Sequence, residues 1–305
     1  MLKSKNLKAY LAFIAVAIFW GTTFLAIRIG IHKEDGYYFP PFLLAAFRHC
    51  IAGVLICSYF IFYKKQPLPT LNQFKYFSIN GILMLVGGNG IISWGMQYVD
   101  SGLAAILCAL TPLWIVFINL AIGSSEKVTK VMWAGFIICL LAQYLIFYDK
   151  VNILSNQNYI YGLIAIVVSN ICWAFGTVFS KSSTSTFPVL YNAGLQMIPG
   201  GFILLVFSTL KGDWQQLNPS SNSIWAMVYL IVFGSLLAYG CFMYIIKALP
   251  AALVSTYAYF NTIVAVILGV IFLNEPIDEK LVIAMFLTIL GVYLVGKKAK
   301  VKETP

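Results

Sequence analysis

The stretch FLLAAFRHCIAGVLICSYFIF, residues 42–62, decides the fold because it is long and apolar enough to cross a lipid bilayer. Eleven of its residues are Leu, Ile, Phe or Val, and about 20 apolar residues span a hydrocarbon core. Arg48 and His49 nevertheless lie side by side within it. An Arg near mid-span costs about 2.5–3.5 kcal/mol, whereas eleven such side chains contribute roughly 3–6 kcal/mol toward insertion. The segment is therefore predicted to insert as a helix despite its cation.

The composition extends this interpretation to the whole chain. Of 305 residues, 61% are hydrophobic and 10% are charged, whereas a soluble domain has about 25% charged residues. The sequence lacks the period-two alternation of a membrane barrel. The net charge of +10 comes from basic residues in short loops and at the ends, a pattern typical of membrane topology and not of nucleic-acid binding. The predicted class is an all-α membrane protein.

Apolar runs predict ten transmembrane helices in two groups of five. The polar joint DKVNILSNQN, residues 149–158, separates two expected domains of five helices each, at 10–148 and 159–296. The basic first residues imitate a signal peptide. Cleavage after Ala17 would leave about five apolar residues, too few for a signal sequence, so this segment is predicted to be the first helix. The expected spans are 10–31, 41–63, 74–98, 102–122, 131–148, 159–181, 187–210, 224–247, 251–273 and 279–296.

The distribution of basic residues predicts the orientation. With the N-terminus inside, fourteen Lys residues fall on the inner side and four on the outer side, while Arg28 and Arg48 lie in spans. By the positive-inside rule, both termini are cytoplasmic in a multi-pass protein of the cytoplasmic membrane.

The two halves also repeat each other in sequence. Trp20 precedes Arg28 by eight residues, as Trp173 precedes Lys181. Further pairs, 148 to 150 residues apart, are Arg48 with Gln196, Gly53 with Gly201, Gly90 with Gly240, Trp94 with Tyr244, and Tyr144 with Tyr293. Because five is an odd number, the second half enters the membrane from the opposite side. Such an inverted-topology repeat is the architecture of alternating access, with the substrate near the midplane.

Four stretches in this order resemble the drug/metabolite transporter superfamily, specifically its ten-helix permeases with two EamA-type repeats. They are FWGTTFLAIRIGI (19–31), FRHCIAGVLI (47–56), QYVDSGLAAILCALTPLWIVFINLAI (97–122) and LNEPIDEKLVIAMFLTILGVYLV (273–295). The resemblance implies a secondary carrier, often an exporter of amino acids or other small metabolites, with a central cavity between the repeats. The second repeat departs from the first where Gln196 and Thr262 replace the counterparts of Arg48 and Pro112.

Arg48 and His49 each allow two interpretations. Arg48 is either a structural cation, bonded to helix ends or carbonyls or reaching toward the outer headgroups, or a cavity-facing cation that recognises an anionic group such as a carboxylate. His49 is either a packing residue or a titrating one, and it lies about 100° round the helix from Arg48.

Aromatic and amide residues near mid-span form the remaining candidates for a substrate site. Each is open to interhelical packing or substrate contact, because a buried indole N–H or amide needs a partner. As a set they predict a cavity with aromatic faces and neutral hydrogen-bonding groups: Trp20, Asn89, Trp94, Gln97, Trp173, Tyr239, Tyr244, Tyr257 and Asn261.

Glycine and proline residues mark candidate hinges or kinks. The run GGNG, residues 87–90, lacks the Lys of a phosphate-binding loop, so close packing or bending is expected at Gly87, Gly88 and Gly90. Pro112 and Pro199 are each expected to kink a helix, either as a static bend or as a hinge.

The predicted function is a secondary transporter that exports small metabolites such as amino acids. No Asp or Glu lies deep in a predicted span, which disfavours a carboxylate-based proton antiport and cationic cargo. The six Cys residues lack metal-ligand spacing, and neither a metal nor a cofactor is expected. The alternative is an integral-membrane lipid-modifying enzyme that uses Arg48 and His49. The expected partners are a small-molecule substrate and the bilayer, while the sequence leaves the oligomeric state open.

Overall fold

The structure, a computed structural model, describes residues 2–33, 36–123, 129–148, 156–181, 185–249, 254 and 257–296. Within these residues the chain is helical apart from loops and one isolated bridge between Tyr38 and Asn218. Seven of the described helices are long and apolar enough to cross a membrane, and two shorter apolar helices, 130–145 and 257–273, accompany them. The predicted all-helical membrane class is confirmed.

The helices of the first half follow the predicted spans closely. They are α1 (Leu2–Gly30), α2 with its π-helical end η1 (Pro41–Ser58, Tyr59–Tyr63), α3, η2 and α4 (Leu71–Gly81, Ile82–Gly90, Ile91–Gly95), α5 and α6 (Ser101–Cys108, Thr111–Ala121), and α7 (Lys130–Tyr148).

The helices of the second half mirror this order. They are α8 (Gln157–Lys181), α9 (Val189–Leu210), the short η4 (Asp213–Gln216), α10, η5 and α11 (Ser221–Tyr229, Leu230–Tyr239, Gly240–Ala248), α13 (Tyr257–Leu273) and α14 (Glu279–Gly296).

Four of the predicted spans differ from the structure by three residues or more, or by an interruption. The first helix begins at Leu2, eight residues before its predicted start at 10, and the eighth begins at Ser221, three residues before its predicted start at 224. The fourth, expected as one helix over 102–122, is interrupted between Cys108 and Thr111, because Pro112 has no N–H for the helical ladder. The third begins and ends three residues earlier than predicted, since Thr70 starts α3 with a capping box to Gln73. The polar joint falls largely at 149–155, outside the described residues, as does most of the predicted start of the ninth span.

Helices α2 and α9 pack against each other through glycines. A Cβ added to Gly53 would lie 3.0 Å from the backbone nitrogen of Ile198, and one added to Gly201 would lie 2.7 Å from that of Cys50. These two contacts are the same contact made twice, because each glycine and each partner has its repeat equivalent 148 residues away. The reciprocity places an approximate two-fold axis between the halves.

Aromatic contacts at the two ends of α2 show that it runs antiparallel to α9. Phe60, near the end of the α2 span, stacks on Tyr191 at the start of α9, with ring centroids 5.3 Å apart. Phe42, at the start of α2, contacts Phe207 near the end of α9, at 4.9 Å. The second helices of the two halves therefore point in opposite directions.

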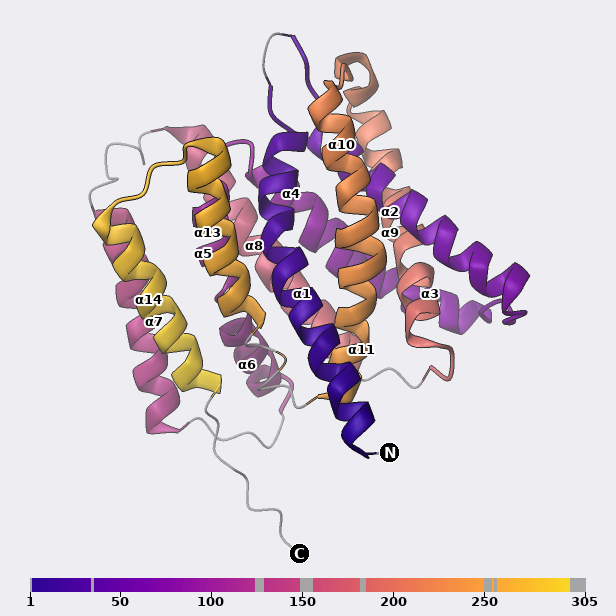
Figure 1. The fold of residues 1–305 in the computed structure, drawn as a ribbon, viewed down its shortest axis with the longest axis horizontal. Helices are drawn as coiled ribbons and strands as arrows, with labels where there is room; N and C mark the ends of the chain where they lie inside the picture. Colours follow the sequence, from indigo (N-terminus) through magenta and orange to yellow (C-terminus); the bar gives the residue numbers. More distant parts are fainter. Residues whose placement is uncertain are drawn as a thin grey trace, which may run out of the picture.

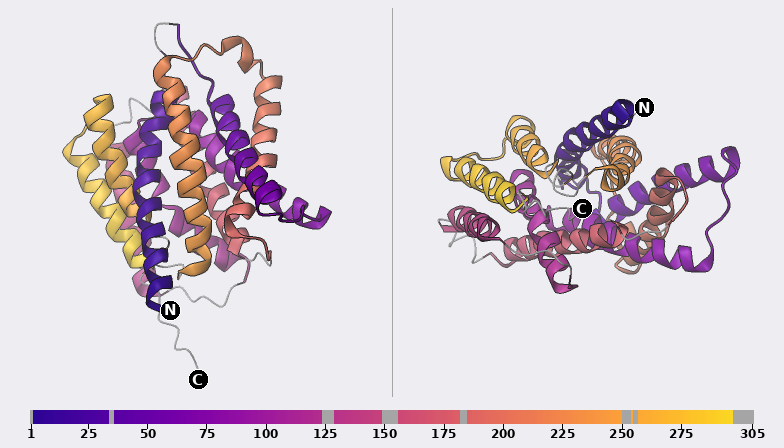
Figure 2. Two further views of the ribbon diagram at one scale, coloured as in Figure 1. Left: turned by 45° about the vertical axis from the view of Figure 1, so that its right-hand side comes forward. Right: turned by 90° about the horizontal axis from the view of Figure 1, so that it is seen from below.

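Helices α7 and α14 form a second pair across the halves. They lie side by side at the left edge in Figure 1, and both views of Figure 2 keep them together. Cys139 of α7 donates to the backbone carbonyl of its repeat equivalent Thr288 in α14, at 3.9 Å. The helices α1, α5, α6, α8 and α13 lie between this edge and the group formed by α2, α3 and α9 (Figure 1).

Candidate substrate cavity

A cavity of about 100 Å³ lies among the central helices, where both halves contribute to its wall. Pockets that bury a small-molecule ligand usually measure about 300–1,000 Å³, so this cavity is small for a substrate site. Its lining comes from α1, α2, η2, α4 and the α5–α6 segment of the first half, and from α8 and α13 of the second half.

The structure brings six of the ten predicted site residues together around this cavity. They are Trp20, Arg48, Asn89, Trp173, Tyr257 and Asn261. Gly88, a predicted hinge residue, also lines it. Substrate contact by these residues stays a prediction.

An aromatic cluster of Trp20, Trp173, Tyr257 and Phe242 forms one wall. The Trp20 ring meets Trp173 and Tyr257 edge-on, with centroids 5.3 Å apart in both cases, and Phe242 lies 4.6 Å from Trp20. Phe242 lies behind the cavity lining and contacts all three other rings. Because Trp20 and Trp173 are repeat equivalents, this wall is shared between the halves and offers edges and faces to an apolar or aromatic group.

Arg48 is the one cation among the residues that line the cavity, and it is only 4% exposed. Its Nε donates to the Ser235 hydroxyl at 2.7 Å, and no carboxylate of the described residues forms an ion pair with it. The guanidinium lies over Gly234, where an added Cβ would come within 2.8 Å of Nη2. Trp20 Nε1 donates to the carbonyl of the same glycine at 3.3 Å. A buried positive charge with a neutral partner is thus held at the cavity wall.

Two amide side chains tie the central helices together in equivalent ways. Asn170 of α8 donates to the Leu107 carbonyl at 2.8 Å and accepts a bond from the Thr111 hydroxyl. Asn261 of α13, with its amide oriented to satisfy its neighbours, donates to the Ala17 carbonyl at 2.6 Å. Ala17 is the repeat equivalent of Asn170, 153 residues earlier, and Thr111 is the repeat equivalent of Asn261, 150 residues earlier. The contact of Asn170 with Thr111 therefore corresponds to the contact of Ala17 with Asn261, but the amide comes from α8 in the first contact and from α13 in the second.

The interruption between α5 and α6 is part of the cavity wall. Ala105, Cys108 and Thr111 line the cavity on either side of it. Its carbonyls are bonded in part by side chains: Thr111 donates to the Cys108 carbonyl at 2.7 Å, in addition to the bond from Asn170 described above. The expected effect of Pro112 is therefore an actual end of one helix and start of another.

Five polar or thiol residues of the cavity were not among the predicted site residues. They are Thr23, Cys108, Thr111, Ser169 and Asn170. Helical spacing carries a signal for two of them, since Thr23 follows Trp20 by three residues and Asn170 precedes Trp173 by three. Residues three apart share a helical face, so the positions of the two Trp residues indicate both.

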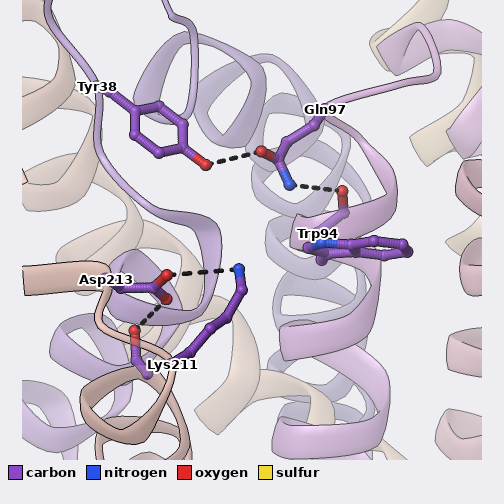
Figure 3. A network of polar contacts seen from close by, with 6 residues as sticks. Tyr38, Trp94, Gln97, Lys211 and Asp213 are labelled. Carbon is purple, nitrogen blue, oxygen red and sulfur yellow. Dashed lines mark hydrogen bonds and ion pairs between the residues drawn. The ribbon is translucent and has the colours of Figure 1, made fainter. Parts of the chain in front are cut away.

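Trp94 and Gln97 lie outside the cavity lining, in a network of polar contacts with Tyr38 (Figure 3). Gln97 accepts a hydrogen bond from the Tyr38 hydroxyl at 2.8 Å and donates to the Trp94 carbonyl at 3.1 Å. Burial, together with Asp213 and Tyr98, raises the pKa of Tyr38 to about 12. The phenol therefore stays protonated and remains a donor to Gln97 at physiological pH. This network fixes the loop before α2 to the end of α4.

Tyr239 and Tyr244 also lie away from the cavity lining. The Tyr239 hydroxyl donates to Gln196 Oε1 at 2.7 Å, and Tyr239 is 2% exposed. Tyr244 packs against the hydrophobic core that contains Trp20. Gln196, the counterpart of Arg48, thus bonds to a core tyrosine instead of lining the cavity.

The predicted hinge glycines lie where helices approach closely. Added Cβ atoms would come within 2.7 Å of Cys172 at Gly87, 2.8 Å of Trp173 at Gly88 and 2.6 Å of Leu204 at Gly90. Pro199 lies within a continuous α9. These contacts account for the glycines by packing, and hinge motion at any of the five positions stays a prediction.

Comparison with known proteins connects this architecture to a family. The model of the EamA-like transporter family matches twice, at residues 7–148 and 160–297. The "Uncharacterized inner membrane transporter YedA" of Escherichia coli (strain K12) is 33% identical over 296 residues, covering 94% of this chain and 92% of that protein. The "Uncharacterized transporter YoaV" of Bacillus subtilis (strain 168) is 25% identical, covering 94% and 96% of the two chains.

A solved crystal structure of another protein shares the fold. It has a TM-score of 0.67 and 19% sequence identity, and the match covers 96% of this chain and 97% of that one. Two family matches over nearly the whole chain, and a relative at 33% identity, agree with the paired helical halves described above. The chain therefore belongs to the EamA-like transporter family, within the drug/metabolite transporter superfamily, and is a multi-pass transporter of the cell membrane.

Proposed function

We propose that this protein is a secondary carrier that moves small metabolites such as amino acids out of the cell by alternating access. The observation that carries the proposal is the central cavity, whose wall comes from both halves of a two-fold related pair. In carriers built from inverted repeats, the substrate binds near the midplane at this junction.

The chemistry of the wall supports a substrate with a carboxylate. Arg48 is a desolvated cation with a hydroxyl as its partner, and none of the described lining residues is acidic. A guanidinium binds a carboxylate through two parallel hydrogen bonds. The aromatic cluster and Asn89 add apolar faces and a neutral polar group. This combination suits zwitterionic or anionic amino acids better than organic cations.

The same lining bears on energy coupling. Proton-coupled carriers commonly use an intramembrane carboxylate as the exchanging group. The described acidic residues lie at helix ends and in loops: Asp100, Asp213, Glu275, Asp278 and Glu279. We therefore propose facilitated diffusion or exchange for the transport step.

Membership of a transporter family stands against the enzyme alternative, and the geometry of the proposed catalytic pair agrees. Arg48 lines the cavity, whereas His49 is 1% exposed and lies outside that lining, next to the contact between α2 and Gly201 of α9. The two side chains therefore have no common space in which to act on one substrate.

Flux measurements on purified protein in liposomes test the proposal. We expect saturable uptake or exchange of at least one amino acid from a broad panel. Trp20→Ala and Trp173→Ala should each lower that flux about 10-fold or more per folded protein, because each removes a large part of the shared wall. Each also costs roughly 3–5 kcal/mol of folding stability, so the amount of folded protein is measured alongside the flux. Trp133→Ala is the matched control, since Trp133 is 58% exposed on the outside of α7. Non-saturable flux, or equal losses in all three variants, would contradict the assignment.

We also propose that both termini face the cytoplasm, in line with the distribution of Lys residues. Single cysteines in place of Lys64 and Lys211 test this in intact cells with a membrane-impermeant maleimide. Lys64 follows the α2 span and Lys211 follows the α9 span, and these spans run antiparallel. We expect labelling at position 211 and protection at position 64. The reverse pattern would invert the orientation, and equal labelling would remove the antiparallel arrangement itself.

A further inference from the structure

The sequence LNEP places an acidic side chain where α13 ends, at the upper end of the molecule. Helix α13 ends at Leu273, and Asn274 has a φ of 51°, the left-handed conformation in which Asn commonly terminates helices. The chain then turns back, and the backbone N–H of Glu275 donates to the Gly269 carbonyl at 3.1 Å. Pro276 prevents the helix from resuming. Glu275 is thereby held close to the side of α13.

The Glu275 carboxylate reaches across the boundary between the halves. Its Oε1 accepts a hydrogen bond from the backbone N–H of Ser101 at 2.8 Å, and its Oε2 accepts one from that of Gly102 at 3.0 Å. These are the first two residues of α5, whose amides have no partner within the helix. A negative charge at a helix N-terminus is also stabilised by the helix dipole. A residue of the second half therefore caps a helix of the first half.

The surroundings are built to admit this carboxylate. A Cβ on Gly269 would overlap Glu275 Oε2, so any residue other than glycine at this position would displace the carboxylate. Asp100, the residue at the N-cap position of α5, makes no side-chain capping bond of its own. The cap of α5 thus comes from Glu275, 173 residues beyond Gly102 in the chain.

The far end of the capped helix forms part of the substrate cavity. Helix α5 has eight residues, and Ala105 and Cys108 near its C-terminal end line the cavity beside the interruption before Thr111. Because α5 ends at this interruption, α6 does not hold it in place by continuous helical hydrogen bonding. Besides packing along its length against α13, α8 and α1, α5 is bonded by Glu275 at its first turn, by Thr262 of α13 at the Ala105 carbonyl, and by Asn170 at its last turn.

We propose that Glu275 is a positioning residue for transport: its carboxylate fixes the first turn of α5 against α13 of the opposite half and so sets the cavity wall at Ala105 and Cys108. The proposal rests on the carrier function proposed above only in that this cavity binds the substrate. Movement of the halves relative to each other in a transport cycle would strain or break the hydrogen bonds between Glu275 and the amides of Ser101 and Gly102.

The same loop supplies a matched control. Asp278 accepts a hydrogen bond from the backbone N–H of Leu281 at 2.6 Å, which caps the start of α14. Glu275→Gln and Asp278→Asn each remove one negative charge from one loop, and each weakens a helix cap. Only Glu275 joins the two halves, whereas Asp278 acts within its own half. Glu275→Asp keeps the charge on a side chain shorter by one methylene.

Two measurements on full-length protein in lipid nanodiscs test the proposal without a substrate. The first is hydrogen–deuterium exchange of the amides of Ser101 and Gly102. The second is the rate at which Cys108 reacts with 2-aminoethyl methanethiosulfonate, in a protein whose other five Cys residues are replaced by Ala. We expect Glu275→Gln to speed exchange roughly 2- to 30-fold, the range of a lost N-cap. We also expect it to change the Cys108 rate at least about 3-fold.

The variants separate the outcomes. Asp278→Asn should leave both readings unchanged and speed exchange only at the start of α14, and Glu275→Asp should restore part of the Cys108 rate. Faster exchange in Glu275→Gln with an unchanged Cys108 rate would reduce Glu275 to a local cap and overturn the proposal, as would equal effects from Asp278→Asn. If Glu275→Gln fails to fold, the rate of Cys108 modification in Glu275→Asp decides the question. A carboxylate that positions α5 must change this rate when its side chain is shortened, so an unchanged rate would overturn the proposal. Neither reading depends on whether the liposome flux assay succeeds.

Discussion

Replacing Arg48 by Met is expected to raise the KM for a transported amino acid at least about 100-fold while the protein still folds. A buried charge that loses its partner typically changes binding by 2–5 kcal/mol, and the substrate carboxylate would lose its counter-charge. Folding should survive, because Met removes the roughly 2.5–3.5 kcal/mol that an Arg costs in a span. Among the described residues, the side-chain hydrogen bond given up is that to Ser235. Liposome flux and thermal unfolding in detergent measure the two quantities separately.

This experiment separates the two interpretations of Arg48. A structural Arg predicts that the melting temperature falls together with the flux, whereas a substrate-binding Arg predicts loss of flux at an unchanged or higher melting temperature. Arg48→Lys keeps the charge but not the paired donors, and should fall between wild type and Met. Arg28→Met is the matched control, since Arg28 bonds to the Met96 carbonyl outside the cavity lining. A normal KM in Arg48→Met would remove Arg48 from the site.

Gly201→Ala is expected to destabilise the protein by about 1–3 kcal/mol, the cost of overpacking a close contact. The new Cβ would lie 2.7 Å from the backbone nitrogen of Cys50, so two helices must separate instead of one side chain moving aside. The intrinsic helix preference for Ala, worth about 1 kcal/mol, opposes this but is smaller than the upper part of that cost. Thermal unfolding of detergent-purified protein gives the difference.

Gly240→Ala is the matched control, because its added Cβ would meet only Cδ1 of Leu190, the flexible end of a side chain. We expect a small effect or a gain there. Gly53→Ala should behave like Gly201→Ala but more mildly, since its closest backbone contact is 3.0 Å. Equal melting temperatures for the Gly201 and Gly240 variants would show that α2 and α9 separate without cost.

The architecture follows from the sequence because it depends on long-range periodicity in composition. Runs of apolar residues predict the spans by length alone, and equivalent residues such as Gly53 and Gly201 reveal the repeat, although their close contacts came only from the structure. The position of Trp20 and Trp173 in one wall follows from their equivalence in the repeat. Span length and repeat equivalence can both be read from the sequence without knowing which residues are neighbours in the fold.

The finer geometry depends on rotation about each helix axis, which apolar sequence does not specify. Trp94 and Gln97 have the chemistry of site residues but belong to the polar network with Tyr38. Tyr239 turns toward Gln196. In a span that is hydrophobic all round, the period of 3.6 residues gives no apolar stripe to show which side faces the centre. Glu275 lies in a loop and bonds to residues more than 170 positions away, and no local sequence pattern indicates such a contact.

The reciprocal contact of Gly53 with Ile198 and of Gly201 with Cys50 has an evolutionary consequence. In a symmetric dimer of half-length chains, one gene would encode both copies of that contact. Every substitution there would then change the contact at both places. In a single chain the two copies of each position can differ independently. Arg48 and Gln196 differ in this way: the first half supplies the cation at the cavity, while the equivalent side chain of the second half bonds to a core tyrosine.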